Sequence, residues 1–317
     1  MLSRTADHLF WGARYMERAE NSARILDVTY QTTLLPQSTE SAEHNLAALL
    51  KLSELETAFA ARYSQLTIDN ILEFMIWDKT NPASIYSCMR AARENAHAVR
   101  GSVTTEVWET QNSMWLELQD YANNRKAYLD PTMILEWVKY RSHLSRGVVI
   151  GTMLKDDAWC FTRLGTFLER ADNTARILDV KYLAEEGKRK NDAHHEFYHW
   201  NALLRSVSAF EIYRKVYRDV ITPERVAELL ILRPDMPRSL VACLQEIITI
   251  LGLIHNQQSQ ETERRAGFLH AELKYARISD ILDTGLHAYL TRFLDKINDL
   301  GSRISHDFLA PTLEKAA

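Results

Sequence analysis

Two stretches of the chain, 152 residues apart, carry the same acidic, amide and basic side chains at the same spacing. Residues 17–30 read ERAENSARILDVTY and residues 169–182 read ERADNTARILDVKY, with eleven of fourteen positions identical. Carboxylates serve as acids, bases or cation ligands, and arginines clamp anionic groups. The repeated stretch therefore has the residue types that a polar binding or catalytic site requires.

A helical period places these side chains on one face. At 100° per residue, a Glu, an Asn and an Arg fall on one stripe with a further arginine beside it. The candidate site residues are Glu17, Arg18, Asn21 and Arg24 in the first copy, and Glu169, Arg170, Asn173 and Arg176 in the second. Alanine and leucine occupy the opposite face, which predicts close packing in a bundle.

Local ion pairs are the structural explanation of the charges. The acid-then-base pairs at i,i+4 are Glu20–Arg24 and Asp172–Arg176, and such pairs support a helix. We also expect Glu17 to reach Arg14 one turn back. Arg24 is expected to reach Asp27. Against a purely structural role, the two copies differ almost everywhere else yet keep these residues, which favours a shared polar site or a binding edge for another protein.

The repeat continues downstream of the charged helix. Residues 82–88 (PASIYSC) match residues 237–243 (PRSLVAC), and residues 71–77 (ILEFMIW) match residues 226–232 (VAELLIL). The sequence predicts two tandem repeats, residues 1–152 and 153–317, packed as one globular unit with a pseudo-two-fold relation.

Glycine (10) and proline (7) are scarce in the 317 residues, which favours long helices over turn-rich sheets. Breaks are expected at residues 36–41, 78–83, 123–131, 185–192 and 233–237. We therefore predict an all-α bundle of roughly ten to twelve helices.

Composition excludes several functional classes. A net charge of −4 leaves no basic surplus for nucleic acid. No apolar run is long enough for a membrane span, and the N-terminus lacks the apolar core of a signal peptide. Three well-separated cysteines indicate a reduced, cytoplasmic protein. Because nucleotide-binding and hydrolase motifs are missing, we expect no cofactor.

Three weaker signals each have a simple structural explanation. Arg90 and Arg93, with Arg100, form a basic cluster that could clamp an anion or lie solvated beside Glu94. The spacing of His195 and His199 suits zinc, but no third ligand is identified and we expect no metal. Cys88 and Cys243 occupy equivalent repeat positions, and a small buried residue explains both better than a nucleophile.

Several motifs in order resemble the bacterial Alpha-E family, all-helical proteins named for a Glu-Arg (ER) pair. They are LSRTADHLFWGARYMERAEN at the start, SCMRAARENAHAVRGSVTTEVWE at 87–109, LGTFLERADNTARILDV before and within the second copy, and MPRSLVACL at 236–244. The resemblance implies a gene neighbourhood with a circularly permuted ATP-grasp ligase and a transglutaminase-like protein. It implies a role in peptide or amide-bond chemistry, with a peptide as a possible substrate.

Two functional hypotheses follow. In the first, the chain is an accessory or substrate-presenting component that acts with the ATP-grasp ligase. In the second, it is an enzyme in which Glu17 and Glu169 line one pocket between the repeated helices, with arginines orienting a small anionic or peptide substrate. The sequence does not decide between them.

Overall fold

The structure is a computed structural model, and it describes residues 1–34, 39–124, 130–186 and 193–309. Within these ranges helices are the only regular secondary structure, so the all-α prediction is confirmed. The described residues form fifteen α-helices, more than expected from the sequence. The excess arises because short helices stand between the long ones, and apolar periodicity does not resolve a helix of one turn.

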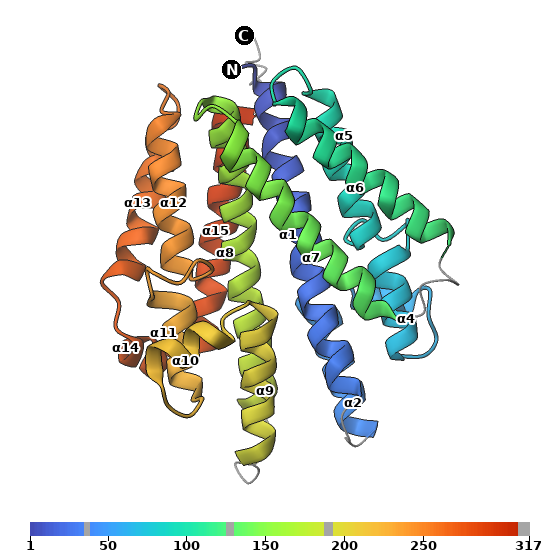
Figure 1. Cartoon of the computed structure of the whole chain (residues 1–317). Helices are drawn as coiled ribbons and strands as arrows, with labels where there is room; N and C mark the ends of the chain where they lie inside the picture. The colour runs from blue at the N-terminus through green and yellow to red at the C-terminus, as the bar shows by residue number, and fades with distance from the viewer. Residues whose placement is uncertain (35–38, 125–129, 187–192, 310–317) are drawn as a thin grey trace.

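Two long helices form the centre of the molecule. α1 (Ser3–Thr33) and α8 (Asp157–Glu186) pack against each other along their length (Figure 1). Both carry the repeated ER stretch, so the packing brings the two copies of that stretch together.

Each central helix has its own surrounding layer. α5 (Ile85–Ala98) and α7 (Pro131–Thr152) pack on α1, with α6 (Thr105–Asn123) against both. α12 (Leu240–Leu253) and α15 (Leu286–Ile304) pack on α8, with α13 (Gln260–Lys274) against both. In Figure 1, α5 and α6 lie to the right of the central pair, α12 and α13 lie to its left, and α7 passes in front of it.

Two further helices contact the central helix of the other half. α2 (Thr39–Leu52) contacts α8, and α9 (Ala193–Ser206) contacts α1. The remaining elements are α3 (Glu56–Ala60), α4 (Ile68–Leu72), η1 (Glu73–Trp77), α10 (Phe210–Tyr217), α11 (Pro223–Leu232), α14 (Ile278–Thr284) and η3 (Ser305–Leu309). The predicted division into repeats falls at the end of α7, and it stays a prediction.

Two expected breaks are confirmed, and matched capping residues begin the helices that follow them. Residues 78–83 and 233–237 lie between helices, whereas α2 begins inside the break expected at 36–41. The breaks expected at 123–131 and 185–192 lie largely outside the described residues. After residues 78–83, Ser84 caps α5 by accepting from the Ser87 amide. After residues 233–237, Ser239 caps α12 by accepting from the Ala242 amide. Serine is preferred at this position because its hydroxyl satisfies a free amide of the first turn.

Both faces of α1 are buried. The predicted small-residue face is confirmed, since Ala19, Ala23 and Leu26 are fully buried. The charged face is also covered, because Glu17 is 1% exposed and Glu20 is 0% exposed. Helices α7 and α8 and the segment before α12 cover this face, so the charges of the repeat are satisfied inside the protein.

The close approach of α1 and α8 depends on one glycine. A Cβ atom at Gly165 would lie 2.2 Å from the backbone oxygen of Phe10. No side chain fits in that space unless the two backbones separate.

We predict that Gly165→Ala destabilises the protein by about 1–3 kcal/mol, because the added methyl group forces the central helices apart. Gly267→Ala is the matched control, since a Cβ atom there meets nothing within 4 Å and alanine favours a helix interior. Thermal melting of both variants measures the difference. A Gly165→Ala protein that melts with or above the wild type would contradict this packing.

Candidate functional site

The two ER pairs bind each other crosswise. Arg170 donates from Nε to Glu17 Oε1 at 2.9 Å and from Nη2 to Oε2 at 3.0 Å. Arg18 donates from Nε to Glu169 Oε1 at 2.6 Å and from Nη2 to Oε2 at 3.1 Å. Each glutamate thus receives a two-pronged guanidinium from the other helix. We call these two ion pairs the crosswise pairs.

A loop arginine adds to the first copy. Arg238, one residue before the cap of α12, donates from Nη1 to Glu17 Oε1 at 2.9 Å and to Asn21 Oδ1 at 3.0 Å. Its Nη2 donates to Glu20 Oε1 at 2.6 Å. The guanidinium of Arg238 is therefore buried among three acceptors of α1.

Helix α7 supplies a further cation to the same carboxylates. Arg146 donates to Glu17 Oε2 at 3.0 Å and also to Glu20 Oε2. The hydroxyl of Ser142 donates to the same oxygen of Glu20 at 2.7 Å. Both carboxylates of the first copy are saturated with donors.

The carboxylates of the second copy have fewer hydrogen-bond donors. Arg14 donates from Nε to Glu169 Oε2 at 2.8 Å. Asp172 accepts from Arg176 Nε at 2.9 Å through Oδ2, but its buried Oδ1 has no hydrogen-bond partner. The two halves of the cluster differ because Glu20 has four donor groups and Asp172 has one.

The predicted pairs at i,i+4 are confirmed, at 2.8 Å for Arg24–Glu20 and 2.9 Å for Arg176–Asp172. Two other expected local pairs are wrong. Arg14 binds Glu169 and not Glu17, because α8 lies within its reach. Asp27 binds Lys139 of α7 at 2.7 Å and not Arg24. Both errors arise because a neighbouring helix competes for a charge on α1.

Arg24 and Arg176, the last arginines of the two repeated stretches, also bind residues of the other half. Arg24 donates from Nη1 to Ser208 Oγ at 2.6 Å, and Arg176 donates from Nη1 to Glu54. Ser208 and Glu54 both have a backbone φ of 56° just after α9 and α2, a left-handed conformation unusual for a residue with a side chain. Each arginine thus ties one helix to the turn that ends a helix from the other half.

The carboxylates of the crosswise pairs are held ionised. Burial raises the pKa of Glu17, but Arg170 and Arg238 outweigh it and bring the pKa to about 2. Burial likewise opposes the ionisation of Glu169, and Arg18 and Arg14 still hold its pKa below the usual value. A carboxylate with a lowered pKa is a poor proton donor near neutral pH.

Comparison with known protein families identifies the chain. A family described as "a predicted alpha-helical domain with a conserved ER motif" matches residues 1–309. The chain belongs to the Alpha-E family. The Glu-Arg pairs that the two copies of the repeat share are Glu17–Arg18 and Glu169–Arg170.

Similar curated proteins add no function. An uncharacterized protein of Mycobacterium bovis and two of Mycobacterium tuberculosis are each 24% identical to the Alpha-E chain over 315 residues, which covers 93% of it. The chain spans 35% of the length of these relatives. No solved structure matches it.

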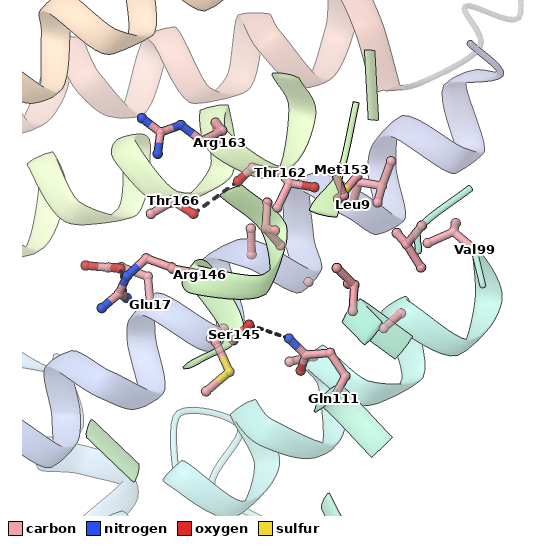
Figure 2. Close-up of a pocket in the computed structure, with 18 of the residues that line it drawn as sticks. Leu9, Glu17, Val99, Gln111, Ser145, Arg146, Met153, Thr162, Arg163 and Thr166 are labelled. Carbon is pink, nitrogen blue, oxygen red and sulfur yellow. Dashed lines mark hydrogen bonds and ion pairs between the residues drawn. The ribbon is translucent and has the colours of Figure 1, made fainter. Parts of the chain in front are cut away.

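Glu17 and Glu169 line different cavities. Glu17 and Arg146 lie at the polar end of a cavity of about 70 Å³, whose walls include Leu9, Val99 and Met153 (Figure 2). Glu169 lines another cavity of about 250 Å³, formed mainly by α1, α2 and α8. The arrangement in which both carboxylates share one pocket is therefore absent from these two cavities.

The basic cluster of α5 stands apart from the ER residues. Arg93 donates to Glu94 at 2.9 Å and to Asn112 at 3.2 Å. Arg90 and Arg100 are exposed to solvent. The pairing of Arg93 with Glu94 agrees with the solvated-face interpretation, and the structure brings none of the three to the crosswise pairs.

The remaining signals are simpler. Burial raises the pKa of the Cys88 and Cys243 thiols to about 12, as expected of packed side chains and not of nucleophiles. In the part of the chain that the structure describes, no three His, Cys, Asp or Glu side chains gather as metal ligands. The side chain of His195 lies outside the described residues. Over the same part, no helix has the length and apolarity to cross a membrane.

Sequence reasoning missed two arginines of the site. Arg238 was detectable, because the repeat alignment places it opposite Ala83 in an otherwise matching segment. Arg146 had no signal, since it stands in a helix without a recognisable repeat partner. Its role depends on how α7 crosses α1, which the sequence pattern does not contain.

We predict that Glu17→Gln lowers the free energy of unfolding by about 3–5 kcal/mol, because buried arginines lose their counter-charge. Glu136→Gln is the control: the Glu136 side chain is 61% exposed and pairs with Lys139 on the surface, so little change is expected. Chemical denaturation of the two variants gives the comparison. Equal stability of Glu17→Gln and wild type would show that the ER pairs are not structural.

Proposed function

We propose that this Alpha-E chain is a non-catalytic, accessory or substrate-presenting component of a peptide- or amide-bond-forming system that acts with an ATP-grasp ligase. The observation that carries the proposal is the state of Glu17 and Glu169. Each is buried, ionised and bound by guanidinium groups, and each lines a different cavity. Such carboxylates serve to hold two helices together.

The competing function, an enzyme with a Glu/Arg active site between the ER helices, has less support. It requires carboxylates with separated pKa values facing one substrate, whereas both pKa values lie below normal. The mycobacterial relatives, in which the matched region is about a third of a longer chain, also fit a module that works beside other domains.

An apolar stripe on α7 suits a protein partner. Met133, Tyr140 and Leu144 are 55%, 75% and 38% exposed, and their spacing places them on one side of the helix. Exposed apolar side chains in a group favour protein binding. The ATP-grasp ligase is the proposed partner, with the transglutaminase-like protein as a second, in the cytoplasm.

Co-purification of the chain with the ATP-grasp ligase, followed by ligation assays with and without the chain, tests the proposal. We expect a complex, and we expect ligation to fall when the chain is omitted. Tyr140→Asp with Leu144→Asp should weaken the complex by at least tenfold, because two charges enter an apolar contact. Leu253→Asp is the control, since Leu253 is 64% exposed but lies on α12.

Two results would contradict the proposal. The first is the absence of both a complex and any effect on ligation. The second is amide-bond chemistry performed by the purified chain without a partner, which would favour the enzyme instead.

A further inference from the structure

The two copies of the repeat differ at one position. An arginine side chain stands there beside the carboxylates of α1, whereas an alanine stands at the matching position beside the carboxylates of α8. Arg238 stands one residue before the cap Ser239, and Ala83 stands one residue before the cap Ser84. The guanidinium of Arg238 binds Glu17, Asn21 and Glu20 of α1. By the repeat, the corresponding residues of α8 are Glu169, Asn173 and Asp172.

These three residues of α8 line the cavity of about 250 Å³, and so does Ala83. Ala83 has only a methyl group, whereas its counterpart Arg238 extends a long side chain to the carboxylates of α1. The cavity therefore corresponds to the space that the Arg238 guanidinium fills in the first copy. Its volume is large enough for several water molecules or one small organic group.

Two residues that line the cavity each have a buried side-chain atom without a hydrogen-bond partner. Asp172 Oδ1 accepts no hydrogen bond, although the matching Glu20 is saturated. Asn21 is 4% exposed, and its Nδ2 lacks an acceptor while its Oδ1 is held by Arg238. A buried polar atom without a partner costs free energy, so a rotation of the Asp172 carboxylate toward a donor in the cavity is favoured.

The charge of the second cluster leaves room for a further cation. Five charged side chains line the cavity, and Arg14 reaches Glu169 from outside it. The carboxylates are Glu54, Glu169 and Asp172, and the guanidinium groups are Arg14, Arg18 and Arg176. This cluster is neutral. In the first-copy cluster, three arginines already face the carboxylates of Glu17 and Glu20, and Arg238 is held there as a fourth. A cation therefore enters the second cluster against less repulsion.

The cavity also has an entrance. The side chain of Glu54 lines it and is 71% exposed, so one wall reaches solvent.

We infer that the cavity beside Ala83 is a binding site for a guanidinium-bearing ligand, which takes the position that Arg238 takes in the first copy. The guanidinium donates to the carboxylates of Glu169 and Asp172 and to the side-chain oxygen of Asn173, the residues that match Glu17, Glu20 and Asn21. The chemistry fits free arginine-like molecules and an arginine side chain of a peptide. The inference does not depend on the proposed function, because it concerns the chain alone.

Isothermal titration of the full chain tests the inference with L-arginine, N-acetyl-L-arginine amide as a peptide mimic, and L-citrulline. Citrulline has the same shape and a neutral urea in place of the guanidinium. We expect either arginine compound to bind at least tenfold more tightly than citrulline, and the tighter of the two identifies the source. Arginine compounds that bind no better than citrulline overturn the inference.

Two variants connect binding to the residues. Asp172→Asn should weaken arginine binding at least tenfold, whereas Asp179→Asn on the same helix, which pairs with His287 outside the cavity, should leave it unchanged. Unchanged binding in Asp172→Asn overturns the assignment.

Ala83→Arg should fill the cavity with an internal guanidinium, raise the melting temperature and abolish arginine binding. A folded Ala83→Arg protein that still binds arginine with wild-type affinity contradicts the inference. If this variant does not fold, the wild-type titrations and Asp172→Asn decide the question.

Discussion

The structure depends on the burial of carboxylates between two packed helices. Glu17, Glu20 and Glu169 are each 5% exposed or less, and an ionised carboxylate without a partner is very costly in such a place. Guanidinium groups from neighbouring elements are what make the packing of α1 on α8 possible. Because Glu17 and Glu169 each bind an arginine of the other central helix, the crosswise pairs also fix the register in which the two helices meet.

Other features of the fold follow from this constraint. The helices must approach closely enough for the side chains to pair, and Gly165 allows that approach. Arg24 and Arg176 use their remaining donors on the turns after α9 and α2. Ion pairs of this kind are weak evidence for stability in themselves, since apolar residues often replace them at no cost. We infer that their role in the Alpha-E chain is to specify which helices pair, and how.

The differences between the two copies have a functional meaning. In the first copy Arg238 and Arg146 complete the cluster, and the carboxylates have no free acceptor for a ligand. In the second copy Ala83 leaves space and Asp172 keeps an unpaired oxygen. A repeat of this type allows one half to hold the fold while the other half binds a small molecule.

Much of the fold could be predicted from the sequence. The repeated segment, its small-residue face and the pairs at i,i+4 depend only on helical period, which the sequence contains. The crosswise pairs could not be predicted, because period shows which residues share a face but not which helix covers it. Arg14 and Asp27 were given the wrong partners for the same reason. Arg146 could not be predicted, because its position depends on how α7 crosses α1, and these helices are distant in sequence.

A double-mutant cycle between Glu17 and Arg170 tests the central claim most directly. The free energy of unfolding is measured for wild type, Glu17→Gln, Arg170→Met and the double variant. If the crosswise pair holds α1 to α8, the two substitutions are coupled by about 0.5–3 kcal/mol, since both remove the same interaction. Additivity of the two effects to within about 0.3–0.5 kcal/mol would contradict the account.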